Sequence, residues 1–310
     1  MRTRPWLAWT ALGVVYVVWG STYLAIRSLV GTVPPLLGAG IRFGAAGPVL
    51  LAAVAVAAGR GAFRVTGRQA GAAVVLGLLM AGGGQGLLTI AETKVSSGIA
   101  ALLVAVVPLY VLALRRLLGD RPPKVTAVGV ALGLAGLAAL LLLGGQAGGA
   151  HGTAWWAPPL VLVAAFSWAL GTVASTRLKM PPNPFTTAGI ELTAAGAALS
   201  ATGLASGQRL VLDEVSTASW LALAYLIVAG SLIAYSAYVF VLAELPLSTV
   251  ATYAYVNPVI AVVLGVLFAG ERFGAAQLAG ALLVLAAVAV VVRAERTAEP
   301  KMSVGAGTMR

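Results

Sequence analysis

Long apolar runs alternate along the chain with short segments that carry charges, prolines or glycines. A helix needs about 20 mostly apolar residues to cross a bilayer. Ten runs have roughly this length, and helices are expected at 7–26, 36–58, 70–90, 97–114, 125–143, 154–176, 185–206, 218–241, 248–268 and 275–292. The pattern predicts an all-α integral membrane protein with ten transmembrane helices.

The composition supports a lipid environment. Hydrophobic residues make up 60% of the 310 residues and charged residues only 9%, whereas soluble domains are about 25% charged. So few charges do not cover the surface of a soluble fold of this size. Glycine occurs 38 times, and small residues let membrane helices approach one another closely.

The basic residues predict the orientation of the helices. With the N-terminus in the cytoplasm, fifteen of the 20 Lys and Arg residues fall in cytoplasmic segments, four fall in outer loops, and Arg42 lies within a helix. Cytoplasmic loops of membrane proteins carry such an excess, so both termini are expected in the cytoplasm. This bias explains the net charge of +11 without a nucleic-acid partner. The first run follows Arg2 and Arg4 without a cleavage pattern, and it is interpreted as an uncleaved first helix.

The two halves of the chain resemble each other when one is shifted by about 149 residues. Both also carry an Ala-Glu pair after the third helix, at 91–92 and 243–244. Each half has five predicted helices, an odd number, so the second must cross the membrane in the opposite sense. Inverted repeats of this kind are typical of secondary transporters. The matched positions are Trp19 with Trp168, GIR at 40–42 with GIE at 189–191, and Pro108 with Pro258.

Four segments carry a resemblance to a known family: VVWGSTYLAIR at 17–27, GIRFGAAG at 40–47, VVPLY at 106–110, and VNPVIAVVLGVLFAGERFGAA at 256–276. Over about residues 7–292 the chain resembles the EamA-type transporters of the drug/metabolite transporter superfamily. The resemblance implies ten helices in two inverted five-helix repeats, cytoplasmic termini, and export or exchange of small metabolites, often amino acids. Asp120 departs from the family's Gly-Glu pattern, which Glu271 keeps.

The expected domains follow the repeat. Residues 1–150 and 151–295 are predicted to form one five-helix unit each, and residues 296–310 a disordered cytoplasmic tail.

Two ionisable residues fall within predicted helices, Arg42 and Glu191. Such groups are costly in a membrane and usually functional. The planar guanidinium of Arg42 suits a substrate carboxylate, although it could instead snorkel outward or bind a loop carbonyl. Glu191 is a candidate for proton coupling or for a structural hydrogen bond. Arg42 and Glu191 enter from opposite faces of an apolar core about 30 Å thick, and each lies about 9 Å below its own face. The distance that remains between them argues against a direct ion pair.

Pro108 and Pro258 are expected inside the fourth and ninth helices. Each removes a backbone hydrogen bond and kinks its helix, which would suit a gate or cavity wall, or equally a static kink. Asn257, beside Pro258, offers hydrogen bonds to the freed backbone.

Aromatic and amide residues form the third group of candidates. A pocket lined by aromatic rings with a few polar groups suits a small amphipathic metabolite, whereas Trp and Tyr also commonly lie at the membrane interface. Trp19, Trp168 and Tyr253 are the favoured pocket residues, with Gln85 and Tyr110 as further candidates. The full set within or near predicted helices is Trp19, Gln85, Tyr110, Trp168, Tyr235, Tyr238, Tyr253 and Tyr255.

Several chemistries are excluded. The chain has no cysteine and one histidine, His151, in a predicted loop, so disulfides and Cys/His metal sites are not expected. Catalytic and ATP-binding motifs are also lacking, and no cofactor is predicted. The leading hypothesis is a secondary carrier that works by alternating access. The alternatives are an intramembrane enzyme acting on a lipid or isoprenoid, a channel, or a scaffold.

Several properties stay open at this point: the substrate, the direction of transport, the coupling ion and the oligomeric state, a homo-oligomer included. The Arg-rich, Lys-poor usage suggests a GC-rich bacterium and therefore a multi-pass protein of the cytoplasmic membrane.

Overall fold

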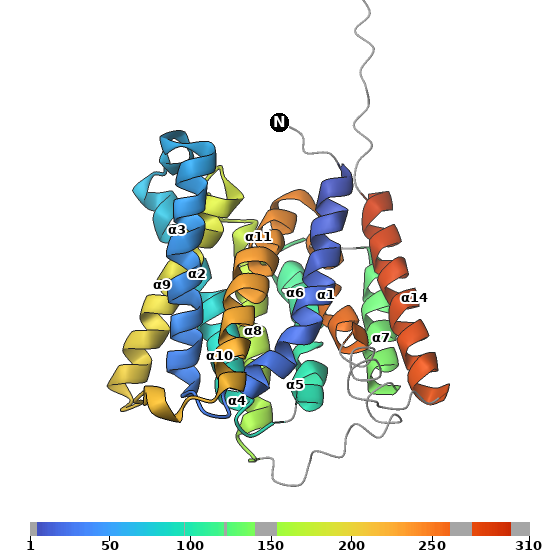
Figure 1. Ribbon diagram of the computed structural model, residues 1–310. Coiled ribbons are helices and arrows are strands. Elements are labelled where there is room, and N and C mark those ends of the chain that lie inside the picture. The colour runs from blue at the N-terminus through green and yellow to red at the C-terminus, as the bar shows by residue number, and fades with distance from the viewer. Residues whose placement is uncertain (1–4, 96, 121–122, 140–153, 261–274, 299–310) are drawn as a thin grey trace, which may run out of the picture.

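The described part of the protein consists of helices joined by turns and short loops (Figure 1). A computed structural model describes residues 5–95, 97–120, 123–139, 154–260 and 275–298, and within them no β-strand occurs. The helices lie side by side in one bundle.

Six helical segments are long and apolar enough to cross a membrane. The third and the sixth of these contain a central π-helix, so each is divided into three elements. They are α1 (Pro5–Leu29), α2 (Pro35–Ala58), α3–η2–α4 (Gly67–Gly77, Leu78–Gly86, Leu87–Ala91), α8 (Ala157–Ser175), α9 (Pro184–Ala205) and α10–η6–α11 (Thr217–Tyr225, Leu226–Ile233, Ala234–Glu244).

The remaining helices are shorter or are described only in part. Among them, α7 and α14 contain the apolar stretches Lys124–Gly136 and Leu282–Ala294. They are η1 (Arg60–Phe63), α5 (Ser97–Val104), α6 (Val107–Leu117), α7 (Lys124–Ala138), η5 (Leu212–Glu214), α12 (Leu247–Ala251), a helical stretch at 253–260, and α14 (Ala275–Ala298).

Most of the expected helix boundaries lie within three residues of the observed ones where the structure describes both. Residues 140–143 and 261–268 of the expected helices, together with His151 and Glu271, lie outside the described residues. Residues 299–310 of the expected tail also lie outside the described residues. Residues 296–298 are helical, because α14 continues to Ala298.

The expectation of one continuous fourth helix with Pro108 inside it is wrong. The structure breaks this segment between Val104 and Val107, and Pro108 lies in the first turn of α6. A proline in the first turn does not destabilise the helix, because the N–H that it lacks would have no partner within the helix there. Pro258, by contrast, lies within the helical stretch 253–260, after a turn at Thr252.

Local sequence explains several helix starts. Thr66 and Gln69 form a reciprocal capping box at the start of α3, which satisfies backbone donors that have no partner within the helix. Asn183 caps α9 with its side-chain oxygen and is followed by Pro184, a proline at a position where its fixed φ favours the helix. Ser216 caps α10 in the same way as Thr66 caps α3.

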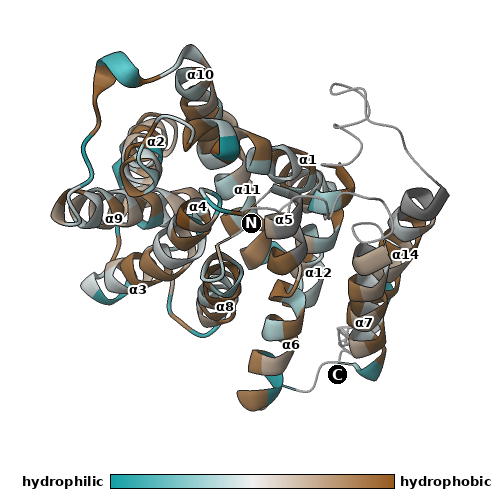
Figure 2. Cartoon of the chain, turned by 90° about the horizontal axis from the view of Figure 1, so that it is seen from below, coloured by the Kyte–Doolittle hydropathy of each residue, from teal (hydrophilic) through white to brown (hydrophobic). Residues whose placement is uncertain are grey.

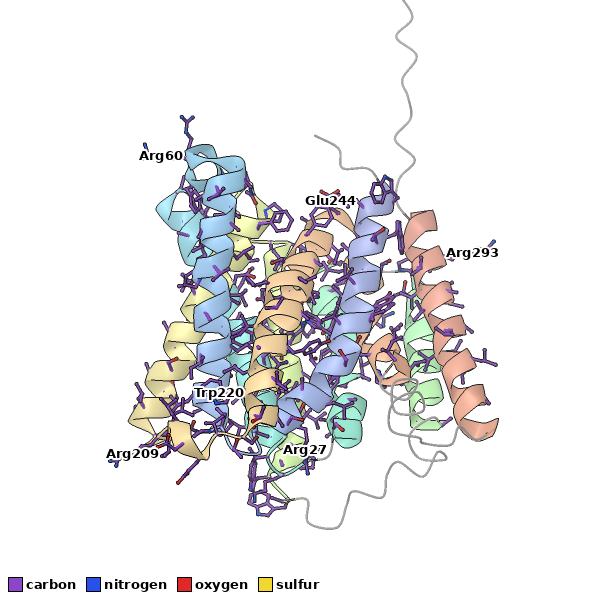
Figure 3. All side chains as sticks on the ribbon, viewed as in Figure 1. Arg27, Arg60, Arg209, Trp220, Glu244 and Arg293 are labelled. Carbon is purple, nitrogen blue, oxygen red and sulfur yellow. The ribbon has the colours of Figure 1, made fainter. Side chains whose placement is uncertain are left out.

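The two ends of the bundle can be told apart by labelled side chains. Arg60 and Glu244 lie at one end, called here the Arg60 end, and Arg27 and Arg209 lie at the other, the Arg27 end (Figure 3). Because α2 ends just before Arg60 and α9 ends just before Arg209, these two helices run in opposite directions.

The closest helix crossing joins α2 to α9, and small residues make it possible. A Cβ atom added to Gly196 of α9 would lie 2.2 Å from the backbone nitrogen of Gly44 in α2. One added to Gly47 would lie 2.5 Å from the backbone nitrogen of Thr193. The two backbones therefore touch directly, in the manner of small-residue interfaces between membrane helices.

A second pair, α7 and α14, lies at one edge of the bundle (Figure 2). Gly129 and Gly133 of α7 both lie at close contacts. A Cβ on Gly129 would come within 2.6 Å of Val291 in α14, and one on Gly133 within 2.9 Å of the Tyr255 ring.

The α2–α9 crossing yields a prediction about stability. Gly196→Ala should lower the thermal midpoint of the detergent-solubilised protein, because overpacking costs about 1–3 kcal/mol and here the added atom meets backbone. Intrinsic tryptophan fluorescence is a suitable readout, since the chain has seven tryptophans and no cysteine for thiol dyes.

Gly71→Ala is the matched control for this experiment. No atom lies within 4 Å of a Cβ built on Gly71 in α3, and alanine favours a helix by about 1 kcal/mol over glycine. Equal midpoints for the two variants would contradict a backbone-to-backbone crossing of α2 and α9.

Candidate functional site

A cavity lies between the two halves of the chain, and residues of both halves line it. Five of the predicted site residues line it: Trp19, Gln85, Trp168, Tyr253 and Asn257. Thr22 and Tyr23 of α1, which the sequence did not single out, also line it. Expected pocket residues from distant parts of the sequence therefore line the same cavity.

Trp19 and Trp168 form the centre of an aromatic cluster. Their ring centroids lie 5.3 Å apart with an interplanar angle of 83°, an edge-to-face geometry that aromatic pairs favour. Tyr253 meets Trp19 in the same way at 5.2 Å. Tyr238 lies against both tryptophans, at 5.0 and 5.2 Å.

Hydrogen bonds hold both indoles in place. Trp19 donates its Nε1 hydrogen to the carbonyl oxygen of Gly230 at 3.1 Å. Trp168 donates to the hydroxyl of Tyr238 at 3.0 Å, and this hydroxyl lies 2.6 Å from that of Thr172. With their polar atoms already bonded, the two rings present fixed apolar surfaces to the cavity.

Asn257 connects two segments that line the cavity. With its amide nitrogen turned toward them, it donates to the carbonyl oxygens of Tyr16 at 3.1 Å and Tyr253 at 3.0 Å. The hydroxyls of Tyr16 and Thr252 lie 2.6 Å apart and join the same two segments. Asn257 therefore binds one backbone carbonyl of α1 and one of its own segment.

Arg42 is buried in the protein beside the cavity and does not snorkel to the surface. Its side chain is 3% exposed, and Nε donates to the hydroxyl of Ser231 at 2.9 Å. The guanidinium lies against Gly230, where an added Cβ would be 3.0 Å from Nη2 and 3.3 Å from Thr22. Since Thr22 lines the cavity, Arg42 lies directly behind the cavity wall.

Glu191 contacts the aromatic cluster through Tyr235. Its Oε2 accepts a hydrogen bond from the hydroxyl of Tyr235 at 3.0 Å. It borders a second cavity, which Met180 and Pro181 also line. Within the described residues Arg42 and Glu191 form no ion pair with each other; each uses a different partner on the η6–α11 segment.

Three further predicted residues do not line the cavity. Tyr110 of α6 packs edge-to-face on Phe166 of α8, with centroids 5.5 Å apart, and so contributes to helix packing. Pro108 follows Val107, which lines the cavity, and Pro258 follows Asn257.

The sequence reasoning missed Glu92. This residue follows α4, has no exposed surface, and neither carboxylate oxygen has a hydrogen-bond partner. It interacts electrostatically with Arg27 and Arg42. The available signal was the Ala-Glu pair repeated in both halves, but its place at the end of a predicted span made Glu92 look like a loop residue.

No group of three or more acidic, His or Cys side chains that could hold a metal ion occurs among the described residues. The cavity instead offers aromatic faces, amides, hydroxyls and a nearby guanidinium. Such a lining binds small organic molecules.

The fold and the cavity together define a class. The described residues include six helices of membrane-spanning length and further apolar helices, and residues of both halves line one cavity. The protein is a multi-pass membrane protein.

The chain belongs to the EamA-like transporter family, whose pattern it matches twice, over residues 5–142 and 155–293. It is 39% identical over 295 residues to YedA, an uncharacterised inner membrane transporter of Escherichia coli K12, covering 94% of this chain and 93% of that protein. A WAT1-related chloroplastic protein of Arabidopsis thaliana is 28% identical over 291 residues, which is 92% of this chain and 69% of that protein. These similarities confirm the resemblance seen in the sequence and make the chain a membrane transporter.

The fold is similar to that of a protein with a crystal structure. The two superpose with a TM-score of 0.74 at 24% sequence identity, over 94% of this chain and 98% of the other. At this identity the similarity concerns the fold alone.

A glycine next to the cavity yields a prediction about the tryptophan cluster. A Cβ on Gly84 would lie 2.7 Å from Cε3 of Trp168, so Gly84→Ala should displace the indole into the cavity. We expect a shifted tryptophan emission spectrum and about tenfold slower transport, the equivalent of about 1.4 kcal/mol.

Gly82→Ala in the same π-helix is the control, because the nearest atom to its Cβ is 3.7 Å away. Indistinguishable spectra and rates for the two alanine variants would contradict the close packing of Trp168 on Gly84.

Proposed function

We propose that the protein is a secondary carrier that exports or exchanges small carboxylate-bearing metabolites, such as amino acids, by alternating access. The observation that carries this proposal is the contact between Trp19 and Trp168 at the wall of the central cavity. The two tryptophans occupy equivalent positions in the two halves of the sequence, so each half contributes the same type of residue to one site. Secondary transporters bind their substrates at such repeat interfaces.

Further features of the fold support two inverted repeats, at residues 1–150 and 151–295. The third long helix of each half contains a π-helix, Leu78–Gly86 and Leu226–Ile233. The helix contacts are also reciprocal, because α1 packs on the α10–η6–α11 segment while α8 packs on the α3–η2–α4 segment. The antiparallel crossing of α2 and α9 fits a two-fold axis in the membrane plane.

Ten membrane crossings account for all described helices longer than one turn. Six are continuous, two are the shorter apolar helices α7 and α14, and two are broken pieces, α5 with α6 and α12 with 253–260. Broken helices within a membrane are tolerated where they line a cavity. Pro108 and Pro258 lie in these broken crossings, which makes them candidates for the moving parts of a gate.

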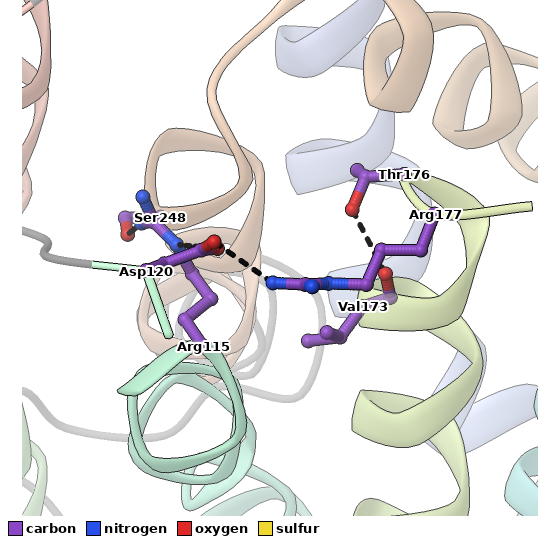
Figure 4. A network of polar contacts seen from close by, with 6 residues as sticks. All are labelled: Arg115, Asp120, Val173, Thr176, Arg177 and Ser248. Carbon is purple, nitrogen blue, oxygen red and sulfur yellow. Dashed lines mark hydrogen bonds and ion pairs between the residues drawn. The ribbon is translucent and has the colours of Figure 1, made fainter. Parts of the chain in front are cut away.

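The distribution of basic residues favours a cytoplasmic Arg60 end, with both termini in the cytoplasm and the protein in the cell membrane. At this end Asp120 joins the two halves (Figure 4). It forms ion pairs with Arg115 of α6 at 3.6 Å and with Arg177, which follows α8, at 2.8 Å. Arg115 also bonds Ser248 of α12.

Neutral hydrogen bonds join the halves at the Arg27 end. The Thr32 hydroxyl donates to that of Ser219 at 2.8 Å, and Ser219 donates to the carbonyl oxygen of Ser28 at 2.8 Å. Gln208 accepts from the backbone of Leu36 and Leu37. In an alternating-access cycle the contacts at the two ends open in turn.

Each residue of the site has a proposed role. Trp19, Trp168 and Tyr253 would pack on the apolar part of a substrate, and Gln85 would offer it an amide. Arg42 would bind its carboxylate: of the guanidinium nitrogens only Nε has a hydrogen-bond partner among the described residues, so both terminal nitrogens are available for a bidentate contact.

Counterflow in proteoliposomes tests the proposal, with labelled amino acids and other small metabolites inside and outside. Accumulation driven by substrate on the opposite side is expected for wild type and lost in Arg42→Ala. Arg42→Lys should rescue little, because a lysine lacks the planar fork. Lack of counterflow across a broad panel with folded protein would shift the assignment toward an intramembrane enzyme or a scaffold.

The orientation is testable because the chain lacks cysteine. Arg60→Cys should resist a membrane-impermeant maleimide in intact cells and react after permeabilisation. Arg209→Cys, at the opposite end of the bundle, should react in intact cells. The reverse labelling pattern would invert the proposed topology without affecting the fold.

A further inference from the structure

Glu92 lies in a charged cluster that the proposed transport mechanism has not yet used. The groups that interact with it electrostatically are Tyr23 and Arg27 on α1 and Arg42 on α2. Lys94, two residues further on, is exposed to solvent. The cluster therefore contains one carboxyl group and two guanidinium groups.

The two arginines differ in how they are held. Arg27 is exposed and donates through Nη1 to the carbonyl oxygens of Glu92 and Val95, at 3.3 and 3.1 Å. It thus caps the end of a helix, where a positive charge is favourable. Arg42 is buried, held by Ser231, and lies behind the cavity wall.

The carboxyl group of Glu92 is buried and has no hydrogen-bond partner. An ionised carboxylate without donors is costly in such a place, whereas two nearby positive charges favour it. Two states are therefore accessible to this group: ionised, as the counter-charge of Arg42, or protonated, provided that another anion takes its place beside Arg42.

We propose that Glu92 is the proton-binding site of the carrier, and that a proton and a substrate carboxylate bind together. This inference rests on the proposed role of Arg42 in binding that carboxylate. Glu92 takes its proton from the water on the side to which the cavity is open and returns it to water on the other side. The substrate carboxylate pairs with Arg42 while Glu92 is protonated, and Glu92 pairs with it again once both have left.

The arrangement explains why the two ligands would be coupled. In both the empty and the loaded carrier one negative charge would balance the buried positive charge of Arg42, which would be costly in the apolar core without it. A proton without substrate, or a substrate carboxylate without a proton, breaks this balance. By reciprocity each ligand raises the affinity for the other by the same factor.

Glu191 is the contrasting buried carboxyl group. It accepts a hydrogen bond from Tyr235 and borders the second cavity. Of the described residues, no arginine contributes to its electrostatic surroundings as Arg27 and Arg42 do to those of Glu92. It therefore serves as the matched comparison for proton binding by Glu92.

The first test uses the proton alone as the probe. Infrared difference spectra of the purified full chain between acid and neutral pH should show the carbonyl band of a protonated buried carboxyl group. We expect this band to disappear in Glu92→Gln and to persist in Glu191→Gln. A titrating band unchanged in Glu92→Gln would overturn the assignment, whether or not a substrate is known.

The second test uses the compound that exchanges in the counterflow panel. One proton per carboxylate would let a gradient of one pH unit sustain about tenfold accumulation. Glu92→Gln should lose this accumulation, and its exchange rate should no longer vary with pH. Glu214→Gln, the same substitution at an exposed carboxylate, should accumulate like wild type.

The outcomes separate the two proposals. Wild-type exchange without a response to the pH gradient, or gradient-driven accumulation retained in Glu92→Gln, would overturn proton coupling and leave the carrier assignment intact. Absence of wild-type counterflow would overturn the carrier assignment, and the infrared result would then decide proton binding by Glu92 independently. The thermal midpoint of Glu92→Gln checks that the variant is folded.

Discussion

The direct contact of the α2 and α9 backbones is the constraint on which the rest of the structure depends. These helices carry the two buried ionisable residues at equivalent positions, Arg42 and Glu191. With glycine at the contact points, the helices approach until backbone meets backbone, and Arg42 and Glu191 reach inward to the η6–α11 segment. Glu191 also packs its own backbone on Gly77, where an added Cβ would lie 2.3 Å from the Glu191 carbonyl oxygen. Larger residues at these points would move both polar groups away from the cavities.

Much of the fold was predictable because hydrophobic length is a strong signal in a membrane protein. The six long apolar helices followed from the sequence alone. The break before Pro108 did not, because a proline inside an apolar run marks a disturbance without telling whether the helix kinks or stops. The π-helices were also unforeseen, because such a widened turn depends on the neighbouring helices and has no simple sequence pattern.

The candidate site was predictable to the extent that its residues are rare in an apolar chain. Trp19, Trp168 and Tyr253 stood out, and the structure brings them together. Tyr110 stood out for the same reason yet packs elsewhere. Glu92 was missed because its burial depends on α1 and α2 covering the end of α4, a tertiary fact that no local pattern contains. Residues at the ends of spans therefore need the structure before their chemistry can be judged.

The two ends of the molecule are held by different chemistry, and this makes them respond differently to the surrounding medium. At the Arg60 end the halves are joined by ion pairs of Asp120, whose side chain is 42% exposed. At the Arg27 end they are joined by hydroxyl and amide groups without net charge. Rising salt weakens exposed ion pairs but has little effect on neutral hydrogen bonds. Ionic strength should therefore act mainly on the contacts at the Arg60 end, and under the proposed alternating access the balance between the two orientations would depend on the salt concentration on a single side of the membrane.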